Sequence, residues 1–250
     1  MFPILIDASW LTIYSYPLFM GLSWGLAYNL GLGYLESRGL DVKGYRMLFW
    51  GTFITSWIGA KVFFLIYSSG DEFVRYSGAS EFWFGGGFVF YGGLIFGTLF
   101  ILLWTTLLKK FPLSQTYLFL PALCFGHAVG RVGCLLAGCC FGTASQIPWS
   151  VHLHGAERHP VQIYESLLVF CLGLFLHRLI TKNTRPLTVT LTYFSGYSLF
   201  RFLFEFFRGD IVRGVHAFGL STSQFISIAL FIVMAAVLMY LKVSTKKEIQ

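Results

Sequence analysis

GLSTSQFISIALFIVMAAVLMYL, residues 219–241, contains no charged side chain and is long enough to cross a bilayer as one helix. The hydrocarbon core of a membrane is about 30 Å thick, and about 20 helical residues span it. Comparable runs recur at residues 13–35, 46–68, 86–108, 114–134, 160–181 and 187–207. Because the runs are continuous rather than alternating, they indicate helices and not barrel strands. We therefore predict an all-α integral membrane protein of about seven transmembrane helices.

The composition supports this class of protein. Hydrophobic residues make up 56% of the chain and charged residues 12%, about half the charged fraction of an average soluble domain. We treat residues 1–250 as a single domain, since we see no low-complexity tract and no internal repeat. Residues 135–159, LLAGCCFGTASQIPWSVHLHGAERH, are too polar for a span. We expect a re-entrant or interfacial loop there, buried in protein or lining a cavity.

The net charge of +7 is explained by topology rather than by a nucleic-acid partner. One side of the predicted membrane holds Arg38, Lys43, Arg46, Lys109, Lys110, Arg178, Lys182, Arg185, Lys242, Lys246 and Lys247. The loops of the other side hold only Arg75, Arg158 and Arg213, together with six acidic residues. The positive-inside rule then places the C-terminus in the cytoplasm and the N-terminus outside. The opening MFPILIDASW shows no cleavable signal peptide.

Ionisable residues inside the predicted spans indicate a functional site. In RFLFEFFRGD, residues 201–210, Arg201, Glu205 and Arg208 are spaced i, i+4 and i+7, which would place them on one helix face. Arg131 lies in GHAVGRVG, where the flanking glycines would let a ligand approach the backbone. Snorkelling or internal salt bridges would explain any one charge alone. A group of arginines favours a phosphate ligand, and the abundant phosphate in a bilayer is the phospholipid head group.

The five cysteines do not form an obvious disulfide framework. Cys134, Cys139 and Cys140 lie close together in sequence, but their spacing differs from that of structural zinc sites. We expect small-residue packing first, a redox-sensitive thiol second and metal binding last. No metal and no organic cofactor is predicted.

The chain resembles the prolipoprotein diacylglyceryl transferase family in motifs spread over nearly its whole length. These are YSYPLF (14–19), FYGGLIFG (90–97), GRVGCLLAGCCFG (130–142), PWSV (148–151), RHPVQIYES (158–166), RFLFEFFRGD (201–210) and GLSTSQFIS (219–227). The resemblance implies a transfer of the diacylglyceryl group from phosphatidylglycerol to the lipobox cysteine of a prolipoprotein, with release of glycerol phosphate. The implied setting is the bacterial plasma (inner) membrane, with membrane lipids and lipobox-containing signal peptides as partners. Nucleic acid is not among the expected partners.

The resemblance also assigns roles to residues. Arg131 and Arg201 would stabilise the departing phosphate, with Glu205 orienting an arginine and Arg208 in support. The substrate contacts would come from Tyr16, Gly92, Gly93, Gly142, Arg131 and Arg208.

Tyr91 belongs with the catalytic residues, but several family members have a histidine there, and a phenol is a poor base at neutral pH. The base is therefore unassigned. His127 and His159 are candidates, or nearby arginines lower the pKa of the thiol. Two other functions stay open: a paralogue acting on a different thiol or lipid, and a non-catalytic anion transporter.

Overall fold

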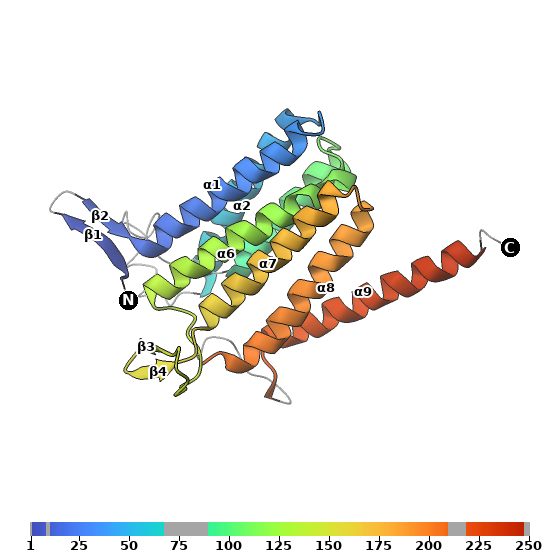
Figure 1. The fold of residues 1–250 in the computed structure, drawn as a ribbon. Coiled ribbons are helices and arrows are strands. Elements are labelled where there is room, and N and C mark those ends of the chain that lie inside the picture. The colour runs from blue at the N-terminus through green and yellow to red at the C-terminus, as the bar shows by residue number, and fades with distance from the viewer. Residues whose placement is uncertain (1, 9–10, 68–89, 210–218, 248–250) are drawn as a thin grey trace. The chain divides into compact units, whose positions relative to one another are not determined.

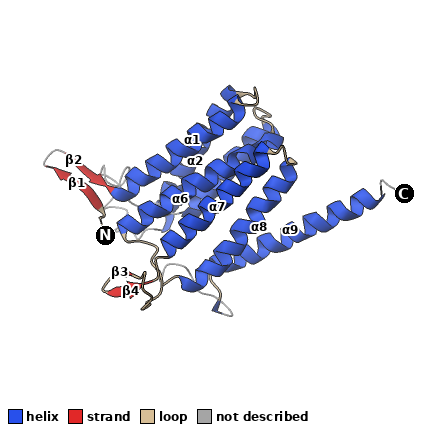
Figure 2. Ribbon diagram, in the orientation of Figure 1, coloured by secondary structure: helices blue, strands red, loops and turns tan. Residues whose placement is uncertain are grey.

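The computed structural model describes residues 2–8, 11–67, 90–209 and 219–247. Helices make up most of this part of the chain (Figures 1 and 2). The α-helices are α1 (Ser15–Glu36), α2 (Val42–Tyr67), α5 (Phe90–Leu102), α6 (Leu120–Ala137), α7 (Val161–Thr181), α8 (Pro186–Phe204) and α9 (Thr222–Lys247). Shorter helical turns are η1 (Leu103–Leu107), η2 (Leu113–Phe119) and η3 (Glu205–Phe207). Each of the seven expected spans overlaps one α-helix, and the all-α prediction is confirmed.

Four helical stretches are long and apolar enough to cross a membrane. They are Val42–Ile66, Leu113–Ala137, Val161–Thr181 and Thr222–Met239, with a shorter apolar stretch at Gly92–Leu107. Large apolar side chains on these helices remain exposed, including Leu167 at 58% and Ile232 at 65%. Such outward apolar surface suits lipid, because a bilayer does not penalise it as water does. The chain is a multi-pass membrane protein.

The contacts divide the chain into two compact units, one formed by Gly31–Thr116 and the other by Met1–Leu30 with Tyr117–Gln250. In the first unit, α2 packs against α5 at small residues. A Cβ on Gly92 would come within 2.7 Å of the Phe63 Cβ, and a Cβ on Gly93 within 3.0 Å of the Ser56 carbonyl oxygen. These glycines therefore allow close helix packing. A single domain over residues 1–250 stays a prediction.

In the second unit, α6, α7, α8 and α9 pack in chain order, each against the next (Figure 1). The contact between α6 and α7 is close at Gly173, where a Cβ would lie 3.0 Å from the Cys124 Cβ. Pro186 opens α8, and Pro160 directly precedes α7. Four helices are thereby brought together at the ends that carry the ionisable residues.

Two β-hairpins were not predicted from the sequence. β1 (Ile4–Ala8) pairs with β2 (Leu11–Tyr14), and β3 (Val151–Leu153) pairs with β4 (Ala156–Arg158). The second hairpin lies within the expected loop 135–159, and its turn residues His154 and Gly155 both have positive φ, at 50° and 73°. Hydrogen bonds from Ser150 and His152 lower the pKa of the exposed Glu157 carboxyl on this hairpin.

Candidate active site

A carboxylate on α7 lies between two arginines from neighbouring helices. Glu165 is 5% exposed. Its Oε2 forms an ion pair with Nη2 of Arg131 on α6 and lies 3.5 Å from Nη1 of Arg201 on α8. Arg131 and Arg201 therefore share one buried anionic partner, although they are far apart in sequence.

The other oxygen of Glu165 faces a histidine. Its Oε1 lies 3.3 Å from Nε2 of His127, which is one helical turn before Arg131 on α6. The His127 side chain is 29% exposed, and its ring lies 5.6 Å from the ring of Tyr197 on α8. A partly exposed imidazole thus lies within ion-pair distance of the carboxylate that the two arginines share, an arrangement that suits proton transfer.

Arg201 has a second anionic partner, the one predicted from the sequence. Its Nη2 lies 2.9 Å from Oε2 of Glu205, which is 1% exposed, and donates a hydrogen bond of 3.0 Å to Oγ of Ser223 on α9. Glu205 was expected to orient one arginine, and the structure pairs it with Arg201; its catalytic role stays a prediction. With contacts from three helices, this guanidinium is fixed in place rather than free to snorkel.

The prediction that Arg201, Glu205 and Arg208 share one helix face is wrong for Arg208. α8 ends at Phe204, η3 follows, and Arg208 has an extended backbone with φ −78° and ψ 138°. Its neighbours pair instead with the loop after α6, where the Thr143 N–H donates to the Phe207 carbonyl at 2.8 Å. This tertiary pairing ends the helix before i+7 is reached. Arg208 lies close enough to Tyr197 to interact with it electrostatically.

The two central arginines retain unused donors. Among the described residues, Nε of Arg131 is buried without a hydrogen-bond acceptor, and Nη1 of Arg201 has the 3.5 Å ion pair with Glu165 but no hydrogen bond. Buried donors of this kind are rare, and a charged acceptor oxygen such as that of a phosphate would satisfy them. The cluster is therefore chemically suited to an anionic ligand.

The glycines around Arg131 do not have the expected role of admitting a ligand. A Cβ on Gly133 would lie 2.6 Å from the Phe19 Cβ, and one on Gly126 would lie 2.9 Å from the Ser23 carbonyl oxygen. Both partners belong to α1, so this face of α6 packs on a helix. Small residues on one helix face indicate close helix packing as well as ligand approach, and these glycines serve helix packing.

The remaining predicted contacts lie in different places. Tyr16, on α1, is within electrostatic range of Arg131. Gly142 forms an isolated β-bridge with Arg208, and its Cβ would lie 2.8 Å from the His159 Cβ. Gly92 and Gly93 lie in the other unit, and the side chain of Tyr91 is outside the described residues. The ligand contacts of all these residues stay predictions.

Glu165 is the central residue that sequence reasoning underrated. In RHPVQIYES, residues 158–166, the i, i+3 spacing of Gln162 and Glu165 suits helix–helix hydrogen bonding as well as substrate contact. Gln162 bonds to a turn rather than to a helix, since its Nε2 donates to the carbonyl of Cys139, after the end of α6, at 2.8 Å. Glu165 lies inside a predicted span, where a carboxylate needs a partner, and other spans contain arginines. That combination in the sequence indicates an ion pair between helices.

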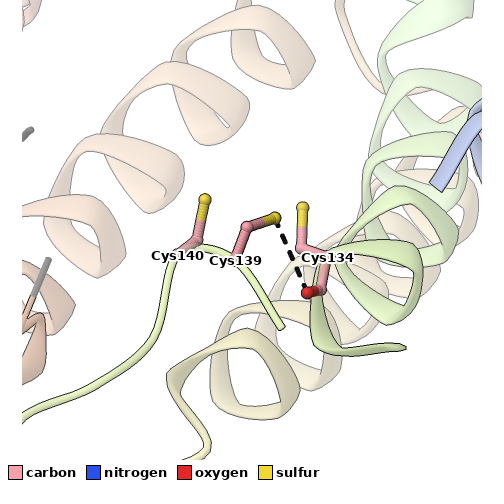
Figure 3. A group of neighbouring side chains, drawn as sticks. All are labelled: Cys134, Cys139 and Cys140. Carbon is pink, nitrogen blue, oxygen red and sulfur yellow. Dashed lines mark hydrogen bonds between the residues drawn. The ribbon is translucent and has the colours of Figure 1, made fainter. Parts of the chain in front are cut away.

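Three cysteine sulfurs lie beside this cluster. Cys134 is near the end of α6, Cys139 and Cys140 follow it, and their Sγ atoms all lie within 4.8 Å of one another (Figure 3). Nη1 of Arg131 is 3.9 Å from Sγ of Cys134. The sulfurs are therefore neighbours of the arginine cluster.

Fold and site together define a multi-pass helical membrane protein with a buried arginine–carboxylate cluster. Residues 3–240 match the family described as prolipoprotein diacylglyceryl transferase. The chain belongs to this family.

Relatives from several bacteria carry corresponding names. A Clostridium perfringens protein, phosphatidylglycerol–prolipoprotein diacylglyceryl transferase 2, is 42% identical over 63% of this chain and 62% of its own length, less than two thirds. The Pasteurella multocida phosphatidylglycerol–prolipoprotein diacylglyceryl transferase is 30% identical over 92% of each chain. A Finegoldia magna protein of the same name is 31% identical over 77% of this chain and 75% of its own.

Proposed function

We propose that this protein transfers the diacylglyceryl group of phosphatidylglycerol to a prolipoprotein cysteine and releases glycerol phosphate. The observation that carries the proposal is the placement of Arg131 and Arg201 on the same buried carboxylate, that of Glu165. The names of the relatives supply the two substrates. A transporter would use the same anion affinity, but family membership favours the transferase.

In the proposed reaction, the substrate sulfur attacks the glycerol carbon that bears the phosphate ester. A C–S bond forms and the C–O bond breaks, with its electron pair remaining on the phosphate oxygen. Negative charge therefore grows on the leaving group as the bond breaks. Guanidinium groups already fixed by Glu165 and Glu205 would stabilise that charge more in the transition state than in the ground state.

The thiol proton needs an acceptor, and we assign that role to His127. Glu165 orients its imidazole, and the ring is partly exposed. His159, the other candidate, packs between the rings of Tyr164 and Phe207. The carboxylate contact favours His127, which leaves Tyr91 as a proposed hydrogen-bond donor to the substrate.

The proposed location is the bacterial plasma membrane, with the N-terminus outside and the C-terminus in the cytoplasm. The support is the distribution of lysine and arginine between the loops. The lipobox cysteine of a signal peptide would then meet the lipid at the outer ends of the helices, and no nucleic-acid partner is needed. We retain Tyr16, Gly92, Gly93, Gly142 and Arg208 as proposed substrate contacts.

The test is a lipidation assay with the purified full chain in phosphatidylglycerol liposomes. We expect mass spectrometry to find a diacylglyceryl adduct on a lipobox peptide, and none on the same peptide with serine in place of cysteine. Phosphatidylethanolamine liposomes test the paralogue hypothesis, since a paralogue that uses this lipid would form the adduct in them. Absence of an adduct with folded protein and lipid both present would contradict the proposal.

A further inference from the structure

The three-cysteine cluster has the arrangement of a metal site that its sequence spacing did not reveal. Cys134, Cys139 and Cys140 each offer a sulfur, and all three sulfurs lie within 4.8 Å of one another. Figure 3 shows the three side chains turned toward the same side of the turn that follows α6. Structural zinc sites take pairs of ligands from two places, whereas this cluster comes from one short segment.

The backbone is bent in a way that gathers the sulfurs. Gly138 ends α6 in the left-handed conformation, with φ 74°, and the Cys139 N–H returns to the Cys134 carbonyl at 3.1 Å. Cys140 also has positive φ, at 56°, which non-glycine residues adopt rarely. This turn brings Cys139 and Cys140 back toward Cys134.

The size of the triangle suits a small thiophilic ion. An ion at the centre of an equilateral triangle with 4.8 Å sides would lie about 2.8 Å from each sulfur, against a zinc–sulfur distance of about 2.3 Å. The separations are at most 4.8 Å. A movement of each sulfur by roughly half an ångström, through rotation of its side chain, would bring it to the zinc–sulfur distance.

A guanidinium group lies next to the cluster. Metal ions bind thiolates rather than thiols. Nη1 of the Arg131 guanidinium lies 3.9 Å from Sγ of Cys134. Positive charge on this side offsets the negative charge of three thiolates around one cation.

We propose that Cys134, Cys139 and Cys140 bind a Zn²⁺ ion and leave its fourth position for the thiol of the incoming peptide. Cys139 is exposed, which leaves the cluster accessible from one side. Zinc sites with three protein ligands and an open fourth position are the catalytic kind, and a thiol bound to such an ion is deprotonated. The role of the fourth position rests on the proposed transferase function, whereas binding of the ion does not.

The step balances without an oxidant. The peptide thiol gives its proton to the acceptor, His127, and its sulfur coordinates Zn²⁺, which stays divalent. When the sulfur attacks the glycerol carbon, the thioether formed is a weaker zinc ligand than the thiolate. The product then leaves and the fourth position reopens.

The test measures metal in the full chain, purified in detergent and incubated with Zn²⁺, with each cysteine changed to serine in turn. We expect about one zinc ion per wild-type chain and a loss of most of that zinc in Cys134→Ser, Cys139→Ser and Cys140→Ser. The matched control is Cys171→Ser, an exposed cysteine on α7 that should retain the wild-type content. Zinc equal to background in the wild type, equal zinc in the cysteine variants, or a disulfide within the cluster would each overturn the site.

Cobalt substitution tests the open position without relying on activity. We expect the sulfur-to-cobalt absorption of the Co²⁺-loaded protein to change when the lipobox peptide is added, and not with its serine counterpart. An unchanged spectrum with bound peptide would overturn the fourth-ligand role. Lipidation by a metal-free protein would sink the zinc role and leave the transferase standing. Metal binding without lipidation would leave the zinc site standing and contradict the transferase function.

Discussion

At the scale of residues, the sequence predicted local pairs and missed distant ones. The spacing of Arg201 and Glu205 is fixed by the helix, so their ion pair could be predicted. Glu165 is 34 positions from Arg131, and no local pattern records that meeting. The site assembled on Glu165 depends on the packing of α6 against α7, which single-sequence reasoning does not supply.

Arg201→Lys tests the need for a planar fork at the site. An ammonium group keeps the charge, but it cannot contact Glu165, Glu205 and a phosphate with fixed geometry. We expect kcat for lipidation to fall by roughly a hundredfold, the usual effect of losing one preorganised donor.

The matched control for that variant is Arg178→Lys, an exposed arginine in the last turn of α7. It should keep the wild-type rate. Near-normal turnover by Arg201→Lys would remove Arg201 from the phosphate role.

At the scale of elements, hydropathy located the helices because each must present apolar surface to lipid. Hydropathy did not locate the helix ends that are determined by tertiary contacts. α8 stops at Phe204 because the following segment pairs with Phe141 and Thr143. The glycines of α6 show the same limit, since small residues serve helix packing and ligand approach alike.

Glu165→Gln tests how the carboxylate joins α6, α7 and α8. Removing the charge leaves two buried guanidinium groups with one shared partner fewer, and breaking a buried pair costs about 3 kcal/mol or more. We therefore expect a lower thermal unfolding temperature in the same detergent.

The comparison variant is Glu157→Gln, whose carboxylate is on the exposed hairpin. Its unfolding temperature should match the wild type. If Glu165→Gln also unfolds at the wild-type temperature, Glu165 does not hold these helices together.

At the scale of the whole molecule, each span predicted from the sequence overlaps an α-helix of the described residues, at approximately the predicted bounds. It missed both hairpins, β1–β2 and β3–β4, because short strands at the ends of helices leave little hydropathy signal. Only the positive-inside rule orients the chain.

Reporter fusions test that orientation. We expect a fluorescent protein at the C-terminus to fold and fluoresce in the cytoplasm, while alkaline phosphatase at the same position stays inactive. An epitope at the N-terminus should be cleaved by protease added to spheroplasts. Active phosphatase at the C-terminus would reverse the predicted topology.

The most direct measurement for the account as a whole is the lipidation rate of the Arg131→Lys/Arg201→Lys double variant beside the wild type, in phosphatidylglycerol liposomes. If these two guanidinium groups together stabilise the departing phosphate, the wild type forms the peptide adduct and the folded double variant forms almost none. Comparable adduct formation by both proteins would contradict the account.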